Sequence, residues 1–577
     1  MSLLLLLSSA VVVAQPPRYD PPLAGPLRVT GTFGELRSDH FHAGLDFRAP
    51  TGTPVLAVAD GFVSRLTVSG GGYGQAVYVD HPDGHRSVYA HLNALAPELT
   101  DTLRARQFAT ERFAQDLRFD SLAYPVRRGQ TLGVVGNRGY SFGSHLHFEV
   151  RDRRTDDALN PLAFGFPVPD HRTPAVRKVR LYVLDEDGNE RATRTVTPVV
   201  TRDGDYVVPD TLRFGSARLG VGVKTYDRQD GMPNWNGIYA GELYADSARV
   251  FDFGFVRIPF AQTEYLNALT DYAAWTDEES WYHRFWRLTP GQFHPRLTDT
   301  LPGARTQVQG EDGKAGQPDG TLRLPAGRPL PVRVVVADHA GNRTTVRLTL
   351  ALDTSLAPAS APPPPPHTYR LPAGEGSVIE TGDMRLELPA TALYRALFFR
   401  YARLPDRSAN YLSDVHQLHD PLVPLHGRAR LTLRPRQAIP RGLRDKVFVG
   451  RCGTDGRLSS RGGTWAGDGR LRASIGSFGN YGLFIDTVPP AVEILSFPTD
   501  QRRSAGFSLR ITDDVAAPLR WRGTVDGAWV LLEYDAKRDR LDYTFAHHDV
   551  PPGEHLFELT LTDGRGNVTR WRRRFRR

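Results

Sequence analysis

Five residues near the start of the chain have the types and spacing that metal chemistry requires. His145 and His147 lie two apart in an apolar run, which predicts a strand with both imidazoles on one face. Such a pair can aim two imidazoles at one metal, or one at the metal and one at its substrate. Upstream, His42 and Asp46 stand four apart on one face of an extended segment, and His91 ends an alternating strand.

If His42, Asp46 and His147 bind one cation, the ligand set suits zinc. Two imidazoles and a carboxylate fit zinc better than magnesium or calcium, which prefer oxygen ligands. Three protein ligands leave the fourth position to water, which is the pattern of a catalytic zinc, and such a water becomes a nucleophile near neutral pH. His91 and His145, placed beside that water, would take its proton and stabilise charge on a carbonyl oxygen.

The other histidines and one carboxylate need a separate interpretation. The chain has 18 histidines, and we expect most of them to be surface or core residues. His40 is interpreted as a residue behind or beside the site, and the pair His416 and His419 as structural, because no partner motif accompanies it. Glu149 would share a face with His147, but we assign it no catalytic role.

A series of motifs in the first 150 residues points to one family. They appear in this order: Phe33-Gly34, His42-x-Gly44-x-Asp46, Gly72-Tyr73-Gly74, Tyr89-Ala90-His91-Leu92, Arg128-Gly129-Gln130 and His145-Leu146-His147-Phe148-Glu149. The series resembles the lysostaphin/LytM-type zinc metallopeptidases, metallopeptidase family twenty-three, which cut peptide cross-links in bacterial peptidoglycan. The resemblance covers about residues 27–150, and every motif position is filled.

The resemblance implies roles for the five residues. His42, Asp46 and His147 would be the ligands of Zn²⁺, and His91 and His145 would be the catalytic pair. One departure is an inserted segment, residues 94–124, whose apolar residues recur at helical spacings. We expect one or two amphipathic helices there that wall or cover the substrate groove.

The rest of the chain predicts a mainly β protein of several domains. Its 577 residues are too many for one core, and short strands alternate with turn residues almost throughout. Similar hairpins close two segments, at Asp338–Asn342 and Asp563–Asn567, as in immunoglobulin-like sandwiches. The expected organisation is a signal peptide (1–14), a LytM-type domain (25–168), a β-sandwich (174–353), a Pro-rich linker (354–368), a β-domain (369–487) and an Ig-like β-sandwich (488–577).

Composition limits the compartment and the partners. The apolar run 3–13 is too short to cross a bilayer, and it precedes residues that suit signal-peptide cleavage after Ala14. No other run is long enough for a transmembrane segment. The net charge of +8 is modest for this length, and no basic stripe with interleaved aromatics predicts nucleic-acid binding. We therefore expect an exported protein of the periplasm or cell surface.

Three functional hypotheses follow. The first is an exported zinc metalloendopeptidase that hydrolyses peptidoglycan stem-peptide cross-links, with C-terminal β-domains that position it on the envelope or on envelope proteins. The second is a catalytically silent peptidase-like module with a docking or regulatory role. The third is a surface protein whose β-sandwiches serve adhesion while the first domain only trims the wall.

Overall fold

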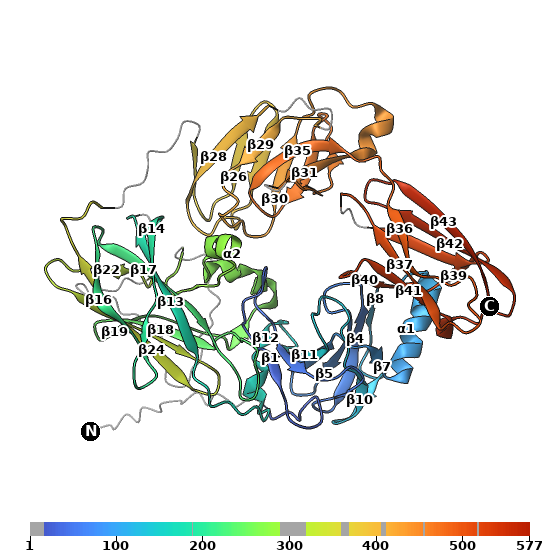
Figure 1. Ribbon diagram of the computed structural model, residues 1–577, viewed down its shortest axis with the longest axis horizontal. Coiled ribbons are helices and arrows are strands. Elements are labelled where there is room, and N and C mark those ends of the chain that lie inside the picture. The colour runs from blue at the N-terminus through green and yellow to red at the C-terminus, as the bar shows by residue number, and fades with distance from the viewer. Residues whose placement is uncertain are drawn as a thin grey trace, which may run out of the picture.

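The chain folds into four β-modules that follow one another around a ring (Figure 1). The computed structural model describes residues 17–186, 188–288, 319–358, 368–405, 411–453, 456–515 and 519–577. The predicted signal peptide and most of the predicted Pro-rich linker lie outside these residues. We refer to residues 17–168, 169–358, 368–486 and 487–577 as the first to fourth modules. The mainly β fold class expected from the sequence is confirmed.

The first module is built on one large sheet and one small sheet. The large sheet has the order β1 (Val29–Gly31), β2 (Leu45–Arg48), β11 (His145–Asp152), β6 (His85–Ala90), β5 (Gln75–Asp80), β4 (Gly61–Val68) and β8 (Gln115–Arg118), with β9 (Pro125–Val126), β12 (Ala158–Leu159) and β20 (Arg257–Ile258) beside it. The small sheet is β3 (Pro54–Leu56), β10 (Thr131–Val134) and β7 (Ala94–Leu95). A 3₁₀ turn, η1 (Pro161–Phe164), follows β12.

The register of β11 brings distant parts of the chain together. This strand lies between β2 and β6, so residues from three separate segments become neighbours. His147 stands opposite Asp46 on one side and opposite Ala90 on the other. The residue after Ala90 is His91, which therefore lies at the same end of the sheet. A one-residue shift would turn every side chain of β11 to the other face, so burial of Leu146, Phe148 and Val150 fixes this register.

The inserted segment contains one helix, α1 (Pro97–Thr110), rather than two. It continues into β8, which pairs with β4 at the sheet edge farthest from β1 and β2. The ring of Phe108 packs against Trp529 and His548 of the fourth module. The segment is therefore a surface on which the fourth module docks, and the expectation that it walls or covers the substrate groove stays a prediction.

Each of the other three modules has two sheets that enclose apolar side chains. In the second module these are β14 (Glu190–Val196), β13 (Ala175–Leu184), β17 (Arg218–Tyr226), β21 (His283–Arg284) and β22 (Leu322–Arg323), against β15 (Val199–Val200), β16 (Tyr206–Phe214), β24 (Arg343–Leu352), β23 (Leu330–Ala337), β18 (Ala240–Ala245) and β19 (Ala248–Gly254). Two short helical segments, η2 (Phe260–Ala268) and α2 (Tyr272–Glu278), also belong to it.

The third and fourth modules repeat the two-sheet arrangement. The third has β25 (Thr368–Leu371), β28 (Leu397–Leu404), β29 (Val415–Leu418), β35 (Gly479–Ile485), β31 (Val447–Cys452) and β32 (Leu458–Ser460), against β26 (Ser377–Glu380), β27 (Met384–Leu388), β30 (Ala429–Leu433), β34 (Leu471–Ile475) and β33 (Thr464–Trp465), with η3 (Arg441–Lys446). The fourth has β36 (Ala491–Ser496), β37 (Gly506–Thr512), β41 (Arg540–Thr544) and β40 (Glu533–Asp535), against β39 (Ala528–Val530), β38 (Arg520–Val525), β42 (Glu554–Thr562) and β43 (Val568–Arg576), with η4 (Phe545–His547).

The first two modules share one hydrophobic core, whereas the third and fourth each have their own. Phe255 of the second module packs against Phe41, and β20 pairs with β12 across the junction. The ring closes through Leu531 of the fourth module, which joins the core of the first. None of the helices in the described parts of the chain has the length and hydrophobicity needed to cross a bilayer.

A buried histidine in the second module makes stability pH-dependent. The His283 side chain is 3% exposed and stacks on Phe253, and burial lowers its pKa to about 4. The pKa of this histidine in the unfolded chain is about 6.5. Between pH 6.5 and pH 4 the unfolded chain therefore binds more protons at His283 than the folded chain does. Neutral His283 therefore contributes up to about 3 kcal/mol to the free energy of unfolding above pH 6.5, and this contribution is lost as the pH falls toward 4.

We predict that His283→Phe, which keeps a ring on Phe253, weakens the fall in melting temperature between pH 6.5 and pH 4. Thermal unfolding followed by circular dichroism at several pH values measures this. His40→Ala, in which a half-exposed side chain is removed, should leave the pH dependence unchanged. The same slope in His283→Phe and the parent chain would contradict the assignment.

Candidate metal centre

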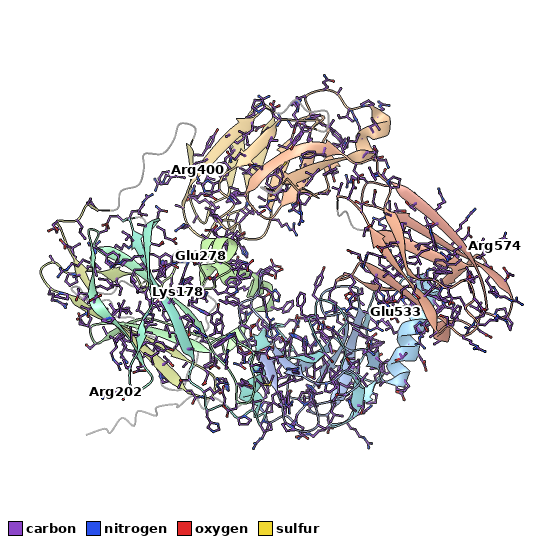
Figure 2. All side chains as sticks on the ribbon, in the orientation of Figure 1. Lys178, Arg202, Glu278, Arg400, Glu533 and Arg574 are labelled. Carbon is purple, nitrogen blue, oxygen red and sulfur yellow. The ribbon has the colours of Figure 1, made fainter. Side chains whose placement is uncertain are left out.

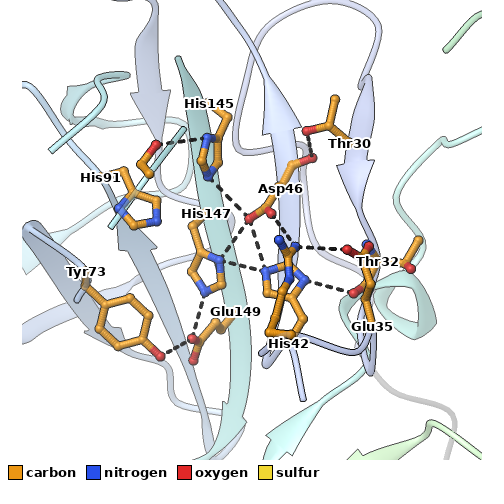
Figure 3. A network of polar contacts seen from close by, with 12 residues as sticks. Thr30, Thr32, Glu35, His42, Asp46, Tyr73, His91, His145, His147 and Glu149 are labelled. Atoms are coloured by element: carbon orange, nitrogen blue, oxygen red, sulfur yellow. Dashed lines mark hydrogen bonds and ion pairs between the residues drawn. The ribbon is translucent and has the colours of Figure 1, made fainter. Parts of the chain in front are cut away.

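Three side-chain atoms from distant segments converge on one point (Figure 3). His42 Nε2 lies 3.0 Å from His147 Nδ1 and 3.1 Å from Asp46 Oδ1, and His147 Nδ1 lies 3.0 Å from the same oxygen. All three residues are buried. Within the described residues, this is the only cluster of potential metal ligands that contains histidine.

The outer partners of the two imidazoles determine which nitrogen atoms carry hydrogen. His42 Nδ1 lies 2.8 Å from the carbonyl oxygen of Thr32, so Nδ1 donates and Nε2 keeps its lone pair. His147 Nε2 lies 2.8 Å from Glu149 Oε1, so Nε2 donates and Nδ1 keeps its lone pair. Two nitrogen lone pairs and a carboxylate oxygen then face one another at about hydrogen-bond distance. Only a positive charge between them makes this arrangement favourable, either a proton or a metal ion.

The pKa values of His42, His147 and Asp46 also indicate that this cluster favours a bound positive charge. Burial lowers the pKa of His42 to about 4. Burial would also lower the pKa of His147, but hydrogen bonds to the carboxylates of Asp46 and Glu149 outweigh it and raise this pKa to about 9. Burial would raise the pKa of Asp46, yet the surrounding imidazoles hold it well below its ordinary value. A zinc ion would take the place of the proton on His147 Nδ1, so the donor set fits this metal.

Two glycines allow the backbone to approach this site closely. A Cβ at Gly44 would lie 2.3 Å from the carbonyl oxygen of Phe148, so a larger residue would push the His42–Asp46 segment away from β11. A Cβ at Gly31 would lie 2.5 Å from Asp46 Oδ2. The position of the ligands therefore depends on residues that have no side chain of their own.

A second layer of polar residues orients the ligands. Glu149 is fully buried, and Arg151 Nε and the Tyr73 hydroxyl donate to its two oxygens over 2.6 and 2.5 Å. The other oxygen of Asp46 accepts a hydrogen bond of 2.9 Å from Arg37 Nη2. The sequence motifs gave Glu149 no role and included Tyr73 only as part of Gly72-Tyr73-Gly74, and they did not include Arg37 or Arg151. For Glu149 and Arg151 the sequence did contain a signal, the alternation of β11, because residues 145, 147, 149 and 151 share one face.

His91 and His145 border the same point. Their ring centroids are 4.9 Å apart, and His145 Nε2 lies 3.4 Å from Asp46 Oδ1. His91 Nδ1 lies 2.8 Å from the carbonyl oxygen of Arg138, and His145 Nδ1 lies 3.0 Å from that of Gly143. Each Nδ1 therefore donates to a carbonyl, and in the neutral imidazole each Nε2 is left free to accept a proton.

The backbone of His91 is strained in a way that aims its side chain. Its φ angle is +62°, in the left-handed region that non-glycine residues adopt at a cost of about 1–2 kcal/mol. Burial, with the neighbouring imidazoles of His147 and His145, lowers the pKa of His91 to about 3. His91 is therefore a neutral imidazole at neutral pH, held beside the metal position.

The fourth module contacts the loop that orients these two histidines, residues 137–143. Lys537 Nζ donates to the carbonyl oxygens of Asn137 and Ser141 over 2.6 and 2.9 Å. Arg138 forms an ion pair of 2.8 Å with Glu533, which lies where the fourth module meets the first (Figure 2). The second module reaches the site from the other side, because the Gly237 amide donates to the hydroxyl of Thr32.

The remaining histidines singled out in the sequence lie away from this centre. His40 is half-exposed and pairs with Asp39. In the third module, the Tyr401 hydroxyl lies 2.9 Å from His416 Nδ1, and His419 Nδ1 accepts from the backbone amide of Arg400. These two rings have structural partners and form no metal cluster among the described residues.

Comparison with known proteins places the first module in a family. The model of peptidase family M23 matches residues 40–108, and the model of the Zu5-like domain matches residues 368–486. Among curated relatives, the DD-carboxypeptidase/endopeptidase Mpg of Neisseria meningitidis is 34% identical over 150 residues, which cover 25% of this chain and 28% of that protein. The peptidoglycan DD-endopeptidase ShyC of Vibrio cholerae is 29% identical over 22% of each chain.

An uncharacterised metalloprotease of Haemophilus influenzae is 31% identical over 22% of this chain and 21% of its own length. The match thus spans less than a third of each of these relatives. The region matched by the family model lies in the first module and includes His42, Asp46 and His91. Residues 40–108 of the first module thus resemble peptidase family M23, the family that the motifs of the sequence indicated.

We predict that Asp46→Ala loses bound zinc, because the two lone pairs that remain lack the carboxylate that completes the site. Metal analysis of the purified chain by inductively coupled plasma mass spectrometry should fall from about one zinc per chain to a trace. His171→Ala, which removes a side chain that is 83% exposed in the second module, is the matched control and should keep its zinc. Full zinc content in Asp46→Ala would exclude this carboxylate as a ligand.

Proposed function

We propose that the protein is an exported zinc-dependent metalloendopeptidase that hydrolyses peptide cross-links of bacterial peptidoglycan. The observation that carries the proposal is the convergence of His42 Nε2, Asp46 Oδ1 and His147 Nδ1, with two further imidazoles beside them. The proposed substrate is the stem peptide, since two of the relatives are named as endopeptidases, one of them of peptidoglycan. Peptidoglycan lies outside the cytoplasm, which supports the expected export to the periplasm or cell surface.

We assign different chemical roles to the metal and to the two histidines beside it. Bound zinc supplies a Lewis acid that lowers the pKa of water and polarises a carbonyl group. His91 and His145 border this position, and both use Nδ1 to donate to a backbone carbonyl. The ring whose Nε2 is unprotonated can accept the proton of the attacking water, and the other ring can donate to the oxygen that gains charge when its Nε2 carries a proton. Their Nδ1 atoms are fixed by backbone carbonyls, and this fixes the direction of both rings.

The completeness of the site favours an enzyme over the silent docking module considered from the sequence. A module that no longer needs metal gains nothing from keeping two imidazoles and a carboxylate buried together, since burial of such polar groups is costly unless a proton or a metal ion satisfies them. Here all three ligand atoms are present, and so is the layer that orients them, in which Glu149 and Arg151 are both buried.

We predict that His91→Ala and His145→Ala each lower kcat on purified peptidoglycan by about 10²–10⁴-fold while zinc content stays at the parent level. Both rings lie beside the metal position without filling it, so catalysis is lost and binding of the metal is kept. Mass spectrometry of the released fragments measures the rate and shows which bond is cut. His171→Ala serves again as control, and parent-level activity in both variants would remove the catalytic roles.

We further propose that the fourth module positions the catalytic loop. Lys537 holds two carbonyl groups of the 137–143 loop, whose other carbonyls hold His91 and His145. Docking of the fourth module on α1, through Phe108 and through the ion pair of Glu111 with Arg522, keeps Lys537 in place. The C-terminal module would then contribute to catalysis through the loop, in addition to any contact with the envelope.

We predict that Lys537→Ala lowers kcat by about 10–100-fold, the usual effect of removing a group that orients a ligand, with little change in KM and none in zinc content. Lys537→Arg should restore part of the rate because it keeps a donor cation. Lys178→Ala, at an exposed position of β13 in the second module, should behave as the parent chain (Figure 2). An unchanged kcat in Lys537→Ala would show that the loop holds its conformation alone.

A further inference from the structure

Six aspartates outside the candidate metal centre form two clusters of carboxylates. In each cluster the three carboxylates offer oxygens that lie within 4.8 Å of one another. The first aspartate triad consists of Asp170, Asp227 and Asp338 in the second module. The second aspartate triad consists of Asp486, the last residue of the third module, and of Asp513 and Asp563 in the fourth.

The two triads occupy the same positions in two different modules. In each, one aspartate stands five residues before the first strand, β13 or β36. Another directly follows the strand that pairs with this first strand, β17 or β37. The third directly follows β23 or β42, in the opposite sheet, and begins the Asp-x-x-Gly-Asn turn that the sequence repeats.

The turns that present the third aspartate are built alike. Asn342 Nδ2 donates to the backbone carbonyl of Asp170 over 3.1 Å and to a carboxylate oxygen of Asp338 over 2.7 Å. Asn567 Nδ2 donates in the same way, to the carbonyl of Asp486 over 3.2 Å and to Asp563 over 2.8 Å. In both cases the asparagine of the Asp-x-x-Gly-Asn turn is hydrogen-bonded to the segment that precedes the first strand, at the aspartate five residues before it.

Buried oxygens without partners show that these clusters are incomplete as they stand. Asp227 is 3% exposed and its Oδ1 has no hydrogen-bond partner among the described residues; Asp486 is 2% exposed and its Oδ2 likewise has none. A buried carboxylate oxygen left in this way costs several kcal/mol unless it is protonated or bound to a cation. Each unpartnered oxygen belongs to a residue whose carboxylate faces two others.

The surroundings of the first triad leave room for an ion, and Arg172, the cation that acts on Asp227 among the described residues, does not outweigh burial and the neighbouring carboxylates. Its three aspartates line a cavity of about 190 Å³ between the first and second modules. None of the ion pairs formed by described residues includes Asp170, Asp227 or Asp338. Burial, followed by repulsion from Asp170 and Asp338, raises the pKa of Asp227 to about 8.

We propose that the two aspartate triads are calcium sites, each holding one Ca²⁺. Ligand sets made only of oxygen are typical of calcium and magnesium, and calcium accepts the irregular geometry of three carboxylates completed by water. Calcium–oxygen distances of about 2.3–2.6 Å place two ligands of one ion up to about 5 Å apart, which agrees with the spread of each triad.

The positions of the triads define what bound calcium does. Asp170 lies where the chain passes from the first module to the second, and Asp486 directly follows β35, where the chain passes from the third to the fourth. An ion at either place links the connecting segment to both sheets of the next module. Calcium therefore fixes the orientation of the second and fourth modules relative to the modules before them, and this inference does not depend on peptidase activity.

The test is calcium titration of the full-length, zinc-loaded chain after removal of free divalent ions, followed by isothermal calorimetry and thermal unfolding. We expect two calcium equivalents per chain, a higher melting temperature with calcium, and a smaller rise with magnesium at the same concentration. Asp227→Asn and Asp563→Asn should each remove one equivalent, or weaken one site by at least about tenfold.

Matched controls separate the sites from general loss of charge. Asp230→Asn and Asp500→Asn remove exposed carboxylates that pair with His171 and Arg502, and both should bind two equivalents. If the parent chain shows neither calcium heat nor a calcium-dependent melting temperature at millimolar calcium, the proposal is wrong. Two equivalents that persist in the Asp227→Asn, Asp563→Asn double variant would also overturn it. The parent titration needs no variant, so poor folding of a variant leaves the test intact.

Discussion

The structure depends on three acceptor atoms held together where water cannot separate them. His42 Nε2, Asp46 Oδ1 and His147 Nδ1 lie 3.0–3.1 Å apart in a buried place, although lone pairs repel at such distances unless a cation lies between them. Strand pairing and hydrogen bonds elsewhere in the fold stabilise the three atoms at these distances. Pairing of β11 with β2 fixes two of the ligands, and partners on the outer nitrogens of both imidazoles prevent the rings from turning away.

The second and fourth modules contact residues that surround this centre, although they follow it in the sequence. The second module shares its hydrophobic core with the first and donates to Thr32, whose carbonyl in turn holds His42. The fourth module returns around the ring to hold the loop behind His91 and His145 (Figure 1). The sheet that carries the candidate metal centre is thus supported from two sides.

The sequence was sufficient to predict the mainly β fold, the family and the five residues that the structure brings together. These features follow from local patterns, since alternation places His145 and His147 on one face and short motifs recur at set spacings. Other features depend on contacts that no local pattern contains. The strained backbone of His91, the role of Arg37 beside Asp46 and the docking of Phe108 on the fourth module arise only when distant strands pair. The inserted segment 94–124 gave a correct helical signal, but periodicity could not show which surface the helix would meet.

The central claim is that a metal ion occupies the point between these three atoms. Anomalous X-ray diffraction from crystals of the full chain, recorded at the zinc absorption edge, tests it most directly. We expect an anomalous peak at about 2.0–2.2 Å from His42 Nε2, Asp46 Oδ1 and His147 Nδ1. A map with no peak there, in which one imidazole has turned its free nitrogen away from Asp46, would contradict it.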